Sequence, residues 1–177
     1  MNLKPILQEA IHRATQQVFS TMLGVEVRCG EVTVENGTQE ASDGVVSFIG
    51  LGGEWAGAGS LSCSPVMACR VCSNMLLCEA TAVNEEVLDA VAELTNMIVG
   101  CVKTDLEAVL GPLALSIPTV VFGKNFKTKS AGGNEWTVFR FHWDEEVLQV
   151  RICLAPSGRA SHVMLHSGGT ETYALDV

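Results

Sequence analysis

The chain has 177 residues, of which 47% are hydrophobic and 18% are charged, and its formal net charge is −9. This length and composition predict one globular domain with a sizeable core and argue against a disordered chain. The negative charge argues against binding to nucleic-acid phosphates or to anionic lipid surfaces. Its apolar stretches end well short of the roughly 20 residues of a membrane span, and charged residues interrupt any signal-peptide core, so we expect a cytoplasmic protein.

The first half of the chain predicts one helix followed by three strands. Residues 4–23 form the helix, because apolar residues recur at spacings of three and four as far as Val18 and Met22, and Gly24 marks its end. The strands alternate in hydrophobicity or are apolar, and turn signals rich in Asn or Gly separate them. We place these strands at residues 25–35, 44–51 and 57–63.

The second half begins with a short helix, for which Ser64 is the predicted N-cap and Pro65 the first residue. A long helix follows over residues 83–111, with Asn84 as its predicted N-cap. Its apolar side predicts a core face made of Val87, Val91, Leu94, Ile98, Val102, Leu106 and Val109. Three further strands are predicted at residues 119–122, 136–143 and 147–154.

Strands that follow one another without intervening helices favour antiparallel pairing and an α+β fold. The two halves also look like distant repeats, each a helix followed by three strands. We therefore expect a pseudo-two-fold fold whose long helices pack across a mostly antiparallel sheet. Residues 1–154 form the predicted single domain, and residues 155–177 a partly flexible C-terminal tail in which residues 163–165 and 173–177 are candidates for an edge strand or a subunit contact.

The other side of the long helix carries an unusual stripe of polar residues and glycine. It consists of Glu86, Asp89, Glu93, Asn96, Gly100, Lys103 and Glu107. Asn is a poor residue in the middle of a helix, and Gly costs about 0.8–1 kcal/mol relative to Ala. Helix stability therefore does not explain Asn96 and Gly100, which lie one turn apart beside Glu93. Close approach of a partner would explain them.

The stripe resembles the signature of the CheC/CheX/FliY group of chemotaxis phosphatases: Asp89-x3-Glu93-x2-Asn96, then Gly100 and Pro118. The surrounding sequence agrees with this resemblance at GEWAGAGSLSCS (53–64), NML (74–76) and EEVLDAVAELTNMIVG (85–100). Because the chain has one Glu-x2-Asn motif rather than two, it is most similar to the CheX-like members, from about residue 4 to about residue 154.

The resemblance implies hydrolysis of the phospho-aspartate of a CheY-like response regulator. Asn96 would position the attacking water, and Glu93 would dock on the regulator's phosphate-contacting lysine. Gly100 would leave room for the regulator, and Asp89 would support the site or contact the partner. The regulator would supply Mg²⁺, so no cofactor or metal is expected in this chain. The resemblance also implies a homodimer that joins sheets edge to edge, with the apolar hairpin 136–154 as our candidate edge.

Three alternatives remain open. A chain of the same fold can be a non-catalytic adaptor that binds a response regulator or a flagellar switch component. Cys69-x2-Cys72, near Cys63 and Cys78, has the spacing of a zinc or redox site, although apolar neighbours favour core packing. In the first helix, Glu9-x2-His12 has His where a second motif would have Asn. A solvated surface histidine is the simpler interpretation of His12.

Glycines at 57 and 59 raise one more possibility, because Gly-x-Gly begins the dinucleotide-binding fingerprint. The third glycine and the opening helix of that motif are missing. A tight hairpin between two strands explains Gly57 and Gly59 better.

Overall fold

The computed structural model describes residues 3–36, 39–130, 135–157, 163–166 and 172–175. The elements, in chain order, are α1 (Leu3–Val18), the π-helix η1 (Phe19–Leu23), β1 (Arg28–Asn36), β2 (Gln39–Gly53), β3 (Trp55–Cys63), α2 (Pro65–Leu76), α3 (Glu85–Leu110), β4 (Leu113–Leu115), β5 (Thr119–Ser130), β6 (Glu135–Trp143), β7 (Glu146–Pro156), β8 (Val163–His166) and β9 (Thr172–Leu175). None of the helices in these ranges is long and apolar enough to cross a membrane.

Within the described residues, nine strands form one sheet in the order β1-β6-β7-β3-β2-β5-β8-β9, with β4 paired to β2. Every pairing is antiparallel. Six of these strands stand in the order β1-β6-β7-β3-β2-β5. If β1 is exchanged with β5, β2 with β6 and β3 with β7, the same order is obtained in reverse. A pseudo-two-fold axis therefore passes between β3 and β7. This topology confirms the predicted α+β fold and its repeat.

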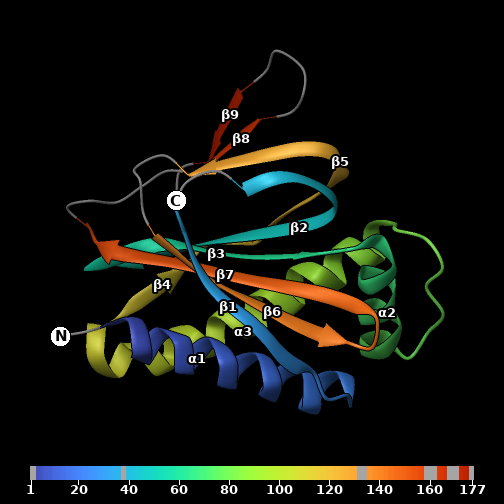
Figure 1. The fold of residues 1–177 in the computed structure, drawn as a ribbon, viewed down its shortest axis with the longest axis horizontal. Helices are drawn as coiled ribbons and strands as arrows, with labels where there is room; N and C mark the ends of the chain where they lie inside the picture. Colours follow the sequence, from blue (N-terminus) through green and yellow to red (C-terminus); the bar gives the residue numbers. More distant parts are fainter. Residues whose placement is uncertain (1–2, 37–38, 131–134, 158–162, 167–171, 176–177) are drawn as a thin grey trace.

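The long helices α1 and α3 lie side by side, in opposite directions, across one face of the sheet (Figure 1). α1 contacts β6, whereas α3 contacts β2, β3 and β5. Gly59 of β3 allows α3 to approach closely, because a Cβ at this position would lie 2.7 Å from Cγ2 of Val99. The core between helices and sheet includes Ile11, Phe19 and Phe141, all of them fully buried. The sheet therefore fixes α3 in place and leaves its outer side open.

Two details of the predicted helices were wrong. The first helix ends in the π-helix η1, and Met22 is 47% exposed rather than buried. A π-helix has more residues per turn, so the spacings of three and four no longer select one face. In α3, Val109 is 40% exposed and Leu110 is buried instead, because Leu110 lies four residues after Leu106 and continues the inner face.

The α2 helix begins as predicted, since the Ser64 hydroxyl accepts a hydrogen bond from the Met67 amide at 3.0 Å and Pro65 is the first helical residue. Near its other end, the Asn74 side chain donates a hydrogen bond to the Leu23 carbonyl at 3.0 Å. This bond ties α2 to the end of η1. The polar residue of the NML segment therefore has a structural role.

The predicted dimer edge was wrong. Residues 136–154 form most of β6 and β7, and both strands lie inside the sheet: β6 pairs with β1 and β7, and β7 pairs with β6 and β3. β1 covers the edge because residues 28–36 pair with residues 135–142, which are about a hundred positions away in the chain. Of the described strands, β1 and β9 stand at the two ends of the sheet. The short strand β4 was not predicted.

Part of the predicted tail belongs to the sheet. β7 continues to Pro156, and β8 pairs with β5 and with β9. Residues 158–162, 167–171 and 176–177, on which the predicted flexibility of the tail falls, lie outside the described residues. The domain boundary at residue 154 stays a prediction.

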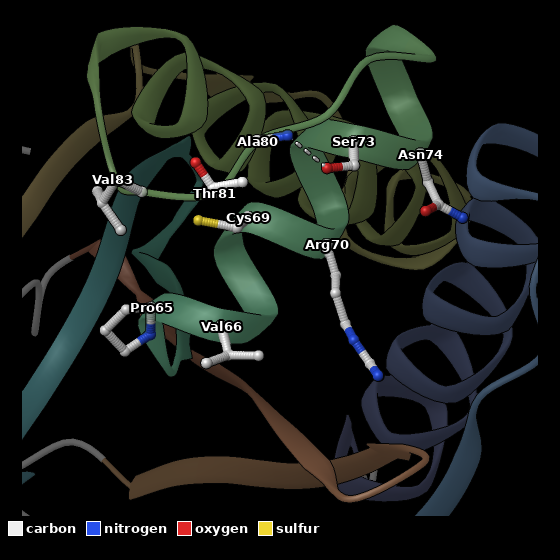
Figure 2. Close-up of a pocket in the computed structure, with 10 residues that line it drawn as sticks. Pro65, Val66, Cys69, Arg70, Ser73, Asn74, Ala80, Thr81 and Val83 are labelled. Atoms are coloured by element: carbon white, nitrogen blue, oxygen red, sulfur yellow. Dashed lines mark hydrogen bonds between the residues drawn. The ribbon is translucent and has the colours of Figure 1, made fainter.

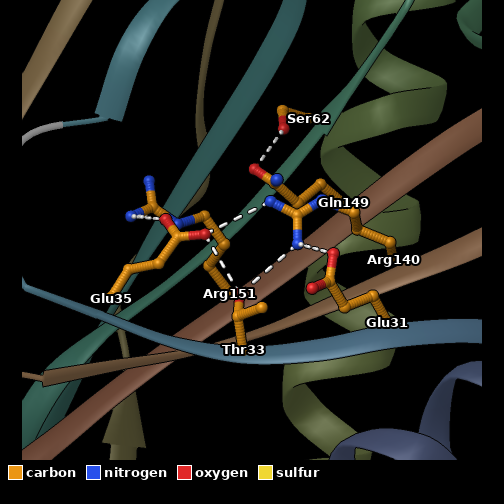
Figure 3. A network of polar contacts seen from close by, with 7 residues as sticks. All are labelled: Glu31, Thr33, Glu35, Ser62, Arg140, Gln149 and Arg151. Carbon is orange, nitrogen blue, oxygen red and sulfur yellow. Dashed lines mark hydrogen bonds and ion pairs between the residues drawn. The ribbon is translucent and has the colours of Figure 1, made fainter.

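The second face of the sheet carries a smaller core and a charged network. β2 and β5 bend back over this face (Figure 1). A second cluster of buried residues consists of Val46, Phe48, Ala58, Trp136, Val138 and Cys153. Beside it, Arg140 contacts Glu31 at 3.4 Å and Glu35 at 3.2 Å, and Arg151, which is 3% exposed, lies 3.5 Å from Glu35 (Figure 3). Arg151 also stacks over the Trp136 ring. Two cations face two carboxylates here, so this network serves the packing of β1, β6 and β7.

Candidate active site

The polar stripe lies on the outer side of α3, and local sequence explains why the helix forms there. The Asn84 side chain accepts a hydrogen bond from the Val87 amide at 3.0 Å, which caps the helix at its N-terminus. Glu85 and Glu86 occupy the first turn, where the positive end of the helix dipole stabilises them. At the other end, the Gly111 amide donates to the Glu107 carbonyl. The helix spans 26 residues, and the stripe lies along its whole length.

The charges of the stripe divide into a free half and a paired half. Glu86, Asp89 and Glu93 are exposed and have no hydrogen bond or ion pair to any other described residue. Further along, Lys103 pairs with Glu107 at 2.8 Å, and this bond lowers the pKa of Glu107. The unneutralised negative charge of α3 is therefore concentrated in the half that contains the motif, where it favours a cationic partner.

Asn96 lies at the edge of a groove of about 410 Å³ between α1 and α3. The groove is lined by Gln17, Asn96, Met97, Gly100, Cys101, Thr104 and Asp105. Asn96 is half-buried, and its carboxamide makes no hydrogen bond within the described part of the chain. A carboxamide has both donors and acceptors, so Asn96 offers an uncommitted pair of polar atoms beside a groove large enough for part of a partner.

The opposite wall of the groove comes from α1. Gln17 belongs to it, and Arg13 pairs with Asp105 of α3 at 2.5 Å, which holds the two helices together. Sequence reasoning did not include Gln17, Cys101 or Thr104 in the site. No local signal marks them, because the groove exists only where α1 packs against α3.

Gly100 lies next to Asn96 on the open side, and internal packing does not require it. A Cβ at this position would meet only Cδ1 of Leu115, at 3.9 Å, which is an ordinary contact distance. Gly100 therefore costs the helix about 0.8–1 kcal/mol relative to Ala without a compensating contact to another described residue. Packing among the described residues does not explain the glycine.

In α1, the residue that aligns with the Asn of the motif is His12, and it packs against the sheet. Glu9 is exposed, but His12 is half-buried and its ring stacks on the buried Phe141, with centroids 6.4 Å apart. His12 thus packs against β6. The simple surface interpretation of His12 was wrong in detail, and its contact with Phe141 explains the residue through packing.

A second groove, of about 320 Å³, lies between α2 and residues 80–83 (Figure 2). It contains no residue of the polar stripe. Arg70 at its rim is already occupied, because it pairs with Asp144 at 3.2 Å and lies over the Trp143 ring. The Cys69 thiol faces this groove, and burial raises its pKa.

Cys63 and Cys153 are buried and also behave as packing groups. Burial raises the pKa of Cys63 to about 12 and that of Cys153 to about 11, so both thiols stay protonated at neutral pH. A protonated thiol is a poor nucleophile. Among the described residues, no group of three or more His, Cys, Asp or Glu side chains has the arrangement of a metal site.

Known proteins resemble this chain in sequence. The sequence model of the family "Chemotaxis phosphatase CheX" matches residues 45–142. The CheY-P phosphatase CheX of Thermotoga maritima is 30% identical over 124 residues, which cover 70% of this chain and 79% of that protein.

Solved structures of similar fold agree with this match. The chemotaxis protein CheX of Desulfovibrio desulfuricans has a TM-score of 0.75 at 24% identity, covering 84% of this chain and 99% of that one. The CheX of Borrelia burgdorferi, solved in a complex with CheY, BeF3 and Mg²⁺, has a TM-score of 0.71 at 21% identity, covering 84% and 97%. Together, the family match, the Thermotoga relative and the shared fold show that this chain belongs to the CheX family of chemotaxis phosphatases.

Proposed function

We propose that this protein dephosphorylates the phospho-aspartate of a CheY-type response regulator. The observation that carries the proposal is the uncommitted Asn96 carboxamide beside a groove, on a helix whose free carboxylates lie in the same half. The Thermotoga relative is named a CheY-P phosphatase, and the Borrelia relative was solved bound to CheY. Both names support a phosphorylated regulator as the substrate. A cytoplasmic location belongs to the same proposal, because response regulators act there.

In the proposed reaction, water attacks the phosphorus in line with the bond to the aspartate oxygen. The new P–O bond forms to water as the acyl phosphate bond breaks, releasing the aspartate carboxylate and inorganic phosphate. Asn96 accepts a hydrogen bond from the attacking water and donates one to a phosphoryl oxygen, and neither step requires it to ionise. Such positioning is the main contribution a protein can make to phosphoryl transfer. The regulator brings the Mg²⁺.

Glu93 and Asp89 serve the encounter in this proposal. Glu93 pairs with the regulator's lysine, and a charge-assisted hydrogen bond of this kind holds α3 over the phosphorylated site. Asp89 is exposed one turn earlier and has no partner within the described chain. Its carboxylate adds to the negative field that attracts the lysine.

The test is catalytic turnover. A substoichiometric amount of this protein should release more than one phosphate per molecule from a phosphorylated CheY-type regulator in the presence of Mg²⁺. Binding of the regulator without such turnover would indicate a non-catalytic adaptor instead.

Replacing Gly100 with alanine should stabilise the protein and weaken its binding to the regulator. The helix gains about 0.5–1 kcal/mol from the substitution, since the added methyl group meets no close contact. The same methyl group would stand between α3 and the docked regulator. Urea unfolding measures the first effect, and equilibrium binding of the regulator measures the second.

A matched control for Gly100→Ala is the reverse substitution Ala108→Gly, at an exposed position on the same helix. It should destabilise the protein by a similar amount and leave binding unchanged. If Gly100→Ala binds the regulator as tightly as the wild type, the proposed close approach at Gly100 is wrong.

A homodimer is also part of the proposal. β1 stands at one end of the sheet, where its unpaired backbone groups are available to a second copy. Sedimentation equilibrium that shows only monomer at high concentration would contradict this part.

A further inference from the structure

The residues of the motif alone do not provide enough surface for a specific complex. A standard protein–protein interface buries about 800 Å² on each partner, and a few well-placed apolar or aromatic side chains supply most of its energy. Glu93, Asn96 and Gly100 offer two polar side chains and a stretch of backbone. Apolar neighbours of this helix face therefore have to contribute to regulator binding.

Leu115 lies beside Gly100, and Ile117 follows Leu115 two residues further along the chain. Leu115 ends β4, and its Cδ1 lies 3.9 Å from the place where a Gly100 side chain would begin. Two residues further along, Ile117 is 87% exposed. Among the large hydrophobic residues whose side-chain exposure the structure describes, Leu77 is more exposed, at 92%.

The segment that carries Ile117 is held firmly. Leu115 pairs with Leu51 of β2. The Ser116 amide donates to the Gly50 carbonyl at 3.0 Å, and the Gly50 amide donates to the Ser116 hydroxyl oxygen at 2.8 Å. Pro118 follows and restricts the backbone further. An isoleucine held in solvent by a fixed backbone loses little conformational entropy when a partner covers it, which favours binding.

We infer that Leu115 and Ile117 form an apolar docking flank for the response regulator, next to the polar stripe of α3. The inference rests on the proposed function, since it names a further contact of the same site. The matching surface of the regulator presents a lysine to Glu93 and an apolar side chain to Ile117. The charge of α3 fits such a partner, because Glu86, Asp89 and Glu93 are free of ion pairs within the described residues.

The test replaces Ile117 with glutamine, which keeps a side chain of similar length and removes its apolar end. Leu77→Gln is the matched control, because Leu77 is similarly exposed but lies at the end of α2. Binding of each variant to a purified CheY-type regulator in its beryllofluoride–Mg²⁺ form is measured by calorimetry. Ile117→Gln should raise Kd for the regulator by about fivefold to tenfold, whereas Leu77→Gln should bind like the wild type. Both variants should have the same free energy of unfolding as the wild type.

Kinetics separate a docking role from a chemical one. Ile117→Gln should raise KM for the phosphorylated regulator and leave kcat unchanged, because Ile117 is not placed at the reacting atoms. Unchanged binding by Ile117→Gln, or an equal loss of binding by Leu77→Gln, would overturn the docking flank. Calorimetry measures binding and requires no turnover. If the wild type binds the regulator but does not dephosphorylate it, the proposed function is contradicted. The comparison of Ile117→Gln with Leu77→Gln still tests the docking flank in that case.

Discussion

Replacing Asn96 with alanine should lower the rate of regulator dephosphorylation by about 10²-fold or more, the usual cost of removing one well-placed hydrogen-bonding group from an active site. The substitution removes the proposed contacts to the attacking water and to a phosphoryl oxygen. It should leave the free energy of unfolding nearly unchanged, because Asn96 makes no hydrogen bond within the described chain and alanine is the better helix former. Single-turnover decay of the phosphorylated regulator measures the rate.

Lys103→Gln provides the control for Asn96→Ala. Lys103 belongs to the same stripe, but its charge is already paired with Glu107, so its loss should change the dephosphorylation rate by no more than about twofold. Binding of the regulator should survive Asn96→Ala, since Glu93 is untouched. An Asn96→Ala protein that turns over like the wild type would remove Asn96 from the mechanism.

Replacing Gly57 with alanine should destabilise the protein by about 3 kcal/mol, at the upper end of the cost of overpacking. Gly57 lies in β3, opposite Leu154 of β7, and an added Cβ would lie 2.0 Å from the Cys153 carbonyl oxygen. Backbone has to move to relieve this contact. β3 and β7 are the central pair of the pseudo-two-fold sheet, so neither strand can shift alone.

Gly52→Ala is the matched control for Gly57→Ala, because a Cβ at Gly52 would meet nothing within 4 Å. Urea unfolding followed by circular dichroism should place Gly52→Ala within about 0.5 kcal/mol of the wild type. If the two variants have the same free energy of unfolding, the backbones of β3 and β7 are packed less closely at Gly57 than the structure shows. The result also bears on the meaning of Gly57-x-Gly59, which the structure explains by close packing of strand against strand and of strand against helix.

The parts of the fold that local sequence determines were predicted well. Asn84 and Ser64 cap their helices as expected, because a capping side chain bonds to an amide only a few residues away. The inner face of α3 was predicted as far as Leu106, because the helical period is regular. The position of the hairpin 136–154 inside the sheet was not predicted, since the pairing of β1 with β6 is non-local and no short pattern reports it.

The residues of the candidate site were likewise predicted only where a local sequence pattern marks them. Asn96 and Gly100 attract attention in the sequence because both violate helix preference, and a violated preference is a local signal. No local pattern marks Ile117, because an isoleucine beside a strand is normally predicted to be a core residue. Its exposure is known only from the structure. Gln17 is similar: its place in the site depends on how α1 packs against α3.

The most direct measurement is the decay of a phosphorylated CheY-type regulator with Mg²⁺, alone and with a substoichiometric amount of this protein. We expect faster decay with the wild type, and decay close to the spontaneous rate with Asn96→Ala. If several CheY-type regulators bind the wild-type protein but lose their phosphoryl group no faster in its presence, the proposed phosphatase activity is contradicted and the chain acts as an adaptor.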